Sequence, residues 1–115
     1  MKFFITSSLF YLVSSATFAQ VRAPHLEATL NKPLSERVRE FSRAGKSGEA
    51  FLRQAPWRKD LGLKARWRAI TTMGKMGPEI FRQDLEKALS SQDWFLRNAG
   101  LIAARSFDQS FLSRW

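Results

Sequence analysis

The sequence of 115 residues contains no cysteine and only one histidine, His25. Without cysteine the chain has no disulfide, no thiolate nucleophile and no cysteine for lipid attachment. A lone histidine without visible partner ligands is interpreted as a solvated residue rather than a metal or catalytic group. Alternating apolar and polar residues are absent, as are Asn-Gly and Asp-Gly dipeptides, which argues against strands and hairpins.

Motifs of catalysis and cofactor binding are also missing. There is no Gly-x-Ser-x-Gly elbow, no His-Glu-x-x-His motif and no glycine-rich phosphate loop. The stretch Gly74 to Gly77 is too short for such a loop and follows no strand. Asp84 and Glu86 point to different sides of their predicted helix, so they do not form a working carboxylate pair. The sequence therefore predicts a protein that is not an enzyme and has no cofactor and no metal site.

Residues 1–19 have the order of a secretory signal peptide. Lys2 supplies the charged start, an apolar run follows over residues 3–13, and mostly small residues occupy positions 14–19. Signal peptidases read small residues just before the bond that they cleave. We therefore expect cleavage after Ala19.

The alternative to cleavage is a membrane anchor. Residues 3–19 reach only the short end of the roughly 17 to 25 residues that a spanning helix needs. We therefore expect an exported chain, located in the periplasm or cell envelope or secreted from the cell.

Removal of residues 1–19 takes away Lys2 and no acidic residue, so the net charge falls by one, from +9 to +8. Such a basic chain favours acidic partners.

The mature chain is expected to be a leader followed by one helical domain. Residues 20–33 contain Pro24 and Pro33 with little apolar periodicity, so they predict an extended leader. Over residues 34–115 apolar residues recur at helical spacing, which predicts an all-α domain. The expected breaks lie at Gly45, at Ala55-Pro56, from Gly74 to Pro78 and at Ser90-Ser91-Gln92.

Helix starts are predicted from residues that favour helix N-termini. Ser47 is expected to cap a short helix, Asp60 a longer one and Asp93 the last one, because their side-chain oxygens accept from free backbone N–H groups. Pro78 is expected in the first turn of the helix that precedes the last one.

Residues 85–104 resemble a HEAT repeat. In that family a first helix ends in spaced leucines, a polar turn ends in Asp, and an apolar-Arg pair followed by small residues opens a second helix. The small residues let neighbouring helices approach closely. The matching residues are Leu85, Leu89, Asp93, Leu96, Arg97, Ala99, Gly100, Ala103 and Ala104.

A weaker self-similarity extends this resemblance toward the N-terminus. Aligning the chain with itself places Arg66 on Arg97, but Asp60 lies further from Arg66 than Asp93 does from Arg97. The resemblance implies a short right-handed stack of antiparallel helical hairpins, that is, a fragment of a HEAT-like α-solenoid. It also implies a protein-binding scaffold without catalytic residues.

The last predicted helix is apolar around most of its circumference. One arc is expected to pack inside the domain, which leaves a second apolar arc in need of cover. Residues after Phe107 could fold back over that second arc as a partial cap. Otherwise the arc is a docking face for another protein or for a second copy of this chain. The predicted docking residues are Trp94, Phe95, Leu101 and Ile102.

A cationic arc on the long helix expected after Asp60 supports a second hypothesis. Lys64, Arg68 and Lys75 fall on one side of that helix and predict an electrostatic stripe. Such a stripe suits an acidic region of a protein partner, but it also suits an anionic polymer, a membrane surface or nucleic acid. Export disfavours nucleic acid. Salt separates the remaining possibilities, because polymer binding weakens steeply as ionic strength rises and apolar docking does not.

Overall fold

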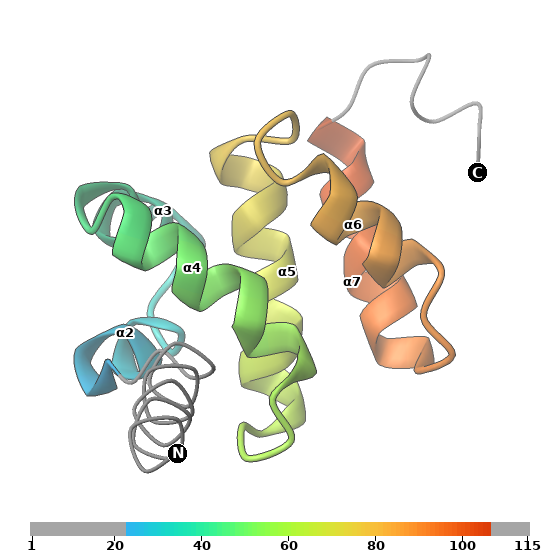
Figure 1. The fold of residues 1–115 in the computed structure, drawn as a ribbon, viewed down its shortest axis with the longest axis horizontal. Coiled ribbons are helices and arrows are strands. Elements are labelled where there is room, and N and C mark those ends of the chain that lie inside the picture. Colours follow the sequence, from blue (N-terminus) through green and yellow to red (C-terminus); the bar gives the residue numbers. More distant parts are fainter. Residues whose placement is uncertain (1–22, 107–115) are drawn as a thin grey trace, which may run out of the picture.

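The computed structural model describes residues 23–106, and every regular element in that range is a helix. The expected all-α class is therefore confirmed for this part of the chain. The predicted signal peptide, and the residues after Phe107 that could cover the last helix as a partial cap, lie outside the described residues (Figure 1). The elements are α2 (Pro24–Thr29), α3 (Leu34–Arg43), α4 (Lys46–Gln54), η1 (Ala55–Trp57), α5 (Leu63–Met76), α6 (Arg82–Leu89), α7 (Trp94–Ala103) and η2 (Ala104–Ser106).

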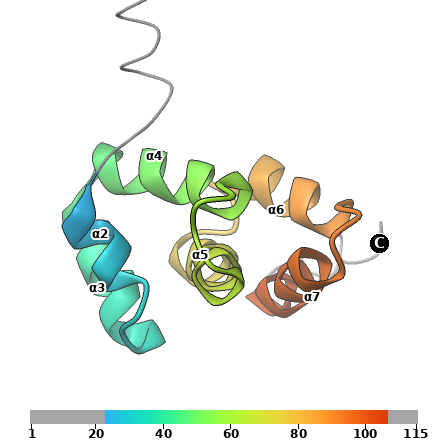
Figure 2. The same ribbon diagram turned by 90° about the horizontal axis from the view of Figure 1, so that it is seen from below.

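The five longer helices lie in two layers. Helices α4 and α6 form one layer, and α3, α5 and α7 form the other, with α5 between its two neighbours (Figure 2). The most extensive contact joins α5 to α7, and α7 also packs against α6. Buried apolar side chains from both layers form one core cluster.

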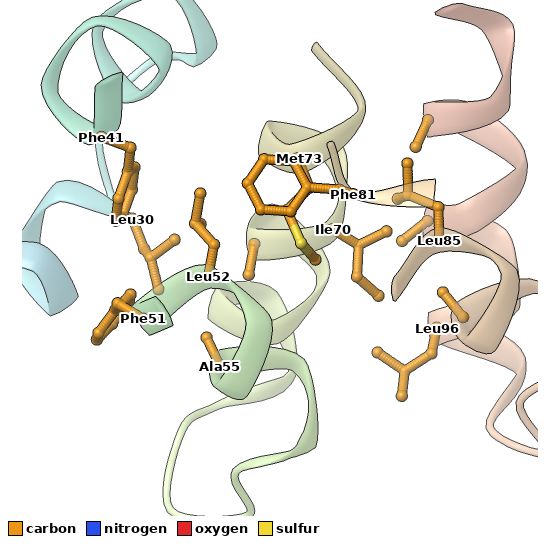
Figure 3. Close-up of a cluster of buried hydrophobic side chains, with 14 of the residues drawn as sticks. Leu30, Phe41, Phe51, Leu52, Ala55, Ile70, Met73, Phe81, Leu85 and Leu96 are labelled. Carbon is orange, nitrogen blue, oxygen red and sulfur yellow. The ribbon is translucent and has the colours of Figure 1, made fainter. Parts of the chain in front are cut away.

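The core is built where the two layers face each other (Figure 3). Because apolar residues recur every three or four positions on α5, Ala69, Ile70 and Met73 all point into it. Phe41 and Phe51 stack with their ring centroids 5.8 Å apart and join α3 to α4. The remaining large side chains that are fully buried are Phe81, Leu30, Leu52, Leu85 and Leu96.

A glycine allows α5 and α7 to approach closely. A Cβ atom at Gly74 would lie only 2.4 Å from Cβ of Ala103 and 2.8 Å from its Cα. Gly100 and Ala88 similarly bring α7 against α6. The small residues that the sequence placed on the last helix are therefore buried at its contacts with both neighbours.

Two predicted helix starts are displaced. Helix α4 begins at Lys46 after Gly45, whose positive φ of 62° follows the end of α3, and no side-chain cap is formed by Ser47. Helix α6 begins at Arg82 rather than near Pro78, because the intervening residues form a separate turn.

The predicted cap at Asp60 is wrong. Both of its carboxylate oxygens accept from Arg58, so the carboxylate is used by a neighbour close in the chain. Helix α5 begins later, at Leu63, with Gly62 as the flanking residue. At α7 the predicted start is confirmed, since Asp93 is the flanking residue, but its side chain makes no capping hydrogen bond.

The prediction of an extended leader over residues 20–33 is wrong for the part that the structure describes. Pro24 occupies the first turn of helix α2, where its missing N–H costs nothing. Leu26, Thr29 and Leu30 are buried, so α2 belongs to the fold. Thr29 donates to Glu40 on α3 over 3.0 Å, and Arg58 reaches Glu27 over 3.2 Å.

Candidate functional site

The outward face of α7 carries two large exposed apolar side chains. Trp94 is 69% exposed and Leu101 is 59% exposed. Their separation in the sequence corresponds to nearly two helical turns, so both side chains emerge on the same side of α7. Large apolar side chains grouped in this way are typical of binding surfaces.

The other two predicted docking residues are less accessible. Phe95 is half-buried against the core, and the guanidinium of Arg66 lies 5.1 Å from its ring centroid. Its ring meets Trp94 edge-on with centroids 6.2 Å apart, so Phe95 supports the exposed indole. Ile102 is also half-buried. The structure therefore divides the predicted set into two exposed residues and two that contribute partly to the fold.

The predicted stripe lies on one side of α5. Lys64 and Lys75 are exposed, and Arg68 is half-buried. At 100° per residue the three positions fall within about 40° of one another. They lie roughly opposite Met73, which points into the core, so they face away from the α4/α6 layer.

Arg68 is held in place by neutral groups. Its Nη1 atom donates to the Leu30 carbonyl over 3.3 Å and to Oδ1 of Asn31 over 3.4 Å. Neither partner carries a negative charge. The guanidinium therefore adds its charge to the stripe without neutralisation by these partners.

Sequence reasoning missed a buried cation beside this stripe. Arg37 on α3 is only 6% exposed and crosses to α5, where Nε donates to Oγ1 of Thr72 over 2.9 Å and Nη2 to Oγ1 of Thr71 over 3.4 Å. Its Nη1 donates to the Lys32 carbonyl over 2.7 Å. Burial, together with the charge of Arg68, lowers the pKa of Arg37 from its usual value. No helical periodicity would have predicted that a charged residue forms this contact.

Charge is distributed unevenly between the helices around the core. Helices α5 and α7 contain five Lys or Arg and no Asp or Glu. Helices α4 and α6 contain four Lys or Arg and three Asp or Glu. The α5/α7 surface is therefore the cationic one, and it also carries the exposed Trp94 and Leu101.

An open groove adjoins this surface between α3 and α5. It has a volume of about 510 Å³ and is lined by Leu34, Ser35, Val38 and Lys75. Leu34 is 38% exposed and forms part of the groove wall. We call this feature the α3/α5 groove.

A second, smaller pocket lies between α2 and α3. It measures about 320 Å³ and is lined by His25, Leu26, Glu40, Arg43 and Ala44. His25 is exposed there, on α2. Hydrogen bonds from Lys32 and Thr29 lower the pKa of Glu40 from its usual value, so this carboxylate is already occupied within the fold.

Within residues 23–106, no group of three or more His, Asp or Glu side chains is placed to hold a metal ion. No helix in the same range is both long and apolar enough to cross a bilayer. The chain matches no protein-family model, no curated protein and no solved structure.

Proposed function

We propose that this chain is an exported, non-enzymatic interaction module that binds an acidic protein partner through the surface of α5 and α7. The observation that carries the proposal is the combination of Trp94 and Leu101, both exposed, with a neighbouring helix whose charges are all positive. Exposed aromatic residues provide the apolar anchors of many interfaces, and a charged surface around them selects the partner.

The same proposal includes a HEAT-like arrangement of hairpins. It is supported by the packing of α4 against α5 and of α6 against α7, and by the contact between the two second helices. Nε1 of Trp67 donates to Oδ1 of Asn98 over 3.1 Å, and the internal similarity aligns these same two positions. Arg97, the arginine of the resemblance, donates to the carbonyls of Ser91 and Gln92 and so stabilises the turn before α7.

Charge favours an acidic protein over a second copy of this chain. Two copies would bring two sets of uncompensated cations together, and like charges across an interface oppose association. An acidic partner would instead place carboxylates opposite Lys64, Arg68 and Lys75. These positions span about 16 Å along α5 at 1.5 Å per residue.

Site-specific photo-crosslinking in the producing cells tests this function. A photoreactive phenylalanine analogue replaces Trp94 in one variant and Gln83, which is exposed on α6, in the matched control. We expect one discrete cross-linked protein from position 94, with an acidic contact peptide identified by mass spectrometry, and none from position 83. Equal products from both positions, or a product that contains only this chain, would contradict the proposal.

A second candidate function is binding to an anionic polymer or membrane surface, favoured by the exposed Lys64 and Lys75 and by the neutral hydrogen-bond acceptors of Arg68. Sedimentation with phosphatidylglycerol vesicles, or with polyphosphate, separates it from protein docking. Binding to either probe that falls steeply between about 50 and 200 mM salt would support this candidate. Absence of binding at the lower salt concentration would remove it.

A further inference from the structure

The α3/α5 groove combines an apolar wall with one charge. Leu34 and Val38 lie one turn apart at the start of α3, and Lys75 lies in the last turn of α5. The volume of about 510 Å³ falls within the range of roughly 300 to 1,000 Å³ that ligand sites occupy. An occupant must therefore offer an apolar group, and a carboxylate beside it would pair with Lys75.

The walls of the groove are held together by an internal contact. Arg37 precedes Val38 on α3 and donates to Thr71 and Thr72 on α5, which fixes the two helices relative to each other. A groove whose walls are already positioned loses little conformational entropy when it is filled.

The groove is also continuous with the surface already described, because Lys75 belongs to both. A segment that places carboxylates along Lys64 and Arg68 arrives at Lys75 directly beside Leu34 and Val38. Resting on the proposed function, we infer that the α3/α5 groove accepts an apolar side chain of the acidic partner, with an adjacent carboxylate of that partner paired to Lys75.

The probe for this inference is N-acetyl-L-phenylalanine, which carries an aromatic side chain next to a carboxylate. Its amide, which has the same ring but no charge, is the matched control. In methyl NMR of the purified protein, we expect the signals of Leu34 and Val38 to shift with N-acetyl-L-phenylalanine and the signals of Leu63, exposed at the other end of α5, to stay in place. The amide should bind at least about fivefold more weakly, because a lost charge-assisted contact costs about one kcal/mol or more.

Two surface variants test which lysine pairs with the carboxylate of the probe. Lys75→Glu and Lys64→Glu change the net charge equally, but only Lys75 lines the groove. We expect Lys75→Glu to weaken binding of N-acetyl-L-phenylalanine at least about fivefold. Lys64→Glu should change that binding by less than about twofold. Equal loss in both variants, or equal binding of the acid and the amide, would overturn the inference.

Other occupants give different signals. Shifts at Leu34 and Val38 that depend on protein concentration without any probe would assign the groove to a second copy, and shifts with phosphatidylglycerol micelles alone would assign it to a lipid. Either result overturns the inference. Crosslinking from position 94 reports separately on the proposed function, because Trp94 lies on α7, outside the groove.

Discussion

Helices α4 and α6 use their charges differently from helices α5 and α7. In the α4/α6 layer Arg53 pairs with Glu49 over 3.9 Å and with Asp84 over 2.8 Å, so the guanidinium joins α4 to α6. In the α5/α7 pair there is no carboxylate to pair with. Cations therefore join helices through carboxylates in α4 and α6, whereas on α5 Lys64 and Lys75 are exposed with no carboxylate on α5 or α7. Positive charge in excess of carboxylates is thus concentrated on α5 and α7.

Separating α5 from α7 should destabilise the protein more than any other change considered below. Because a Cβ at Gly74 would collide with Cβ and Cα of Ala103, Gly74→Ala should force the two helices apart and lower the free energy of unfolding by about 3 kcal/mol. Gly62→Ala is the control, since no atom lies within 4 Å of its added Cβ and its φ of −66° suits alanine. It should change stability by less than about 0.5 kcal/mol. Urea unfolding followed by circular dichroism measures both, and equal effects would show that α5 and α7 are not in close contact.

The next effect concerns the buried cation of α3. Arg37→Ala removes a side chain that satisfies Thr72 and the Lys32 carbonyl. It should therefore lower the free energy of unfolding by about 2 kcal/mol. Arg39→Ala is the control, because Arg39 is exposed on the same helix. It should change stability by less than about 0.5 kcal/mol. Thermal unfolding compares the two variants, and similar values for both would mean that a guanidinium bonded only to neutral groups contributes nothing to the contact between α3 and α5.

A third pair of variants compares the contributions to stability of a half-buried and an exposed side chain of α7. Phe95→Ala removes a half-buried ring that packs on the core and against Arg66. The loss of that ring should lower stability by about 1.5 kcal/mol. Trp94 is mostly exposed, so Trp94→Ala should lower stability by less than about 0.5 kcal/mol and still abolish partner binding. If chemical unfolding showed that Trp94→Ala destabilises the protein as much as Phe95→Ala does, Trp94 would belong to the core and not to a docking surface.

A weaker effect is a pH dependence of stability at Glu40, which accepts hydrogen bonds from Lys32 and Thr29. Its pKa is lowered in the folded state, so its contribution to stability is present above the unfolded pKa and is lost as pH falls through the folded pKa. The stability difference between the native protein and Glu40→Gln should therefore be present at about pH 6 and vanish near about pH 2. Melting temperatures over that range test it, and a difference independent of pH would contradict the role of the Lys32–Glu40 ion pair.

Local patterns predicted the helices better than their ends. The apolar spacing over residues 34–115 predicted an all-α domain because each helix shows its own period. The start of α5 was misplaced because Asp60 has a competing partner in Arg58. Helix α2 was missed because such a short helix contains too few positions to show a period, and Pro24 was interpreted as a sign of extended chain.

For the candidate site, too, the sequence predicted only what one helix determines by itself. The common arc of Trp94 and Leu101 on α7, and the common side of Lys64 and Lys75 on α5, follow from one helix at a time, so the sequence predicted them. The α3/α5 groove and the bonds of Arg37 require two helices to be placed relative to each other. No spacing rule for a single helix contains that information.

We expect partner binding to depend on the charge of the α5 surface and not on the net charge of the chain. Photo-crosslinking from position 94 can be repeated in two charge-matched backgrounds, Lys64→Glu/Lys75→Glu on α5 and Lys46→Glu/Lys87→Glu on α4 and α6. All four lysines are exposed. We predict that the α5 background loses the cross-linked partner and that the α4/α6 background retains it. Equal retention, or equal loss, in both backgrounds would contradict a dependence on the charge of the α5 surface.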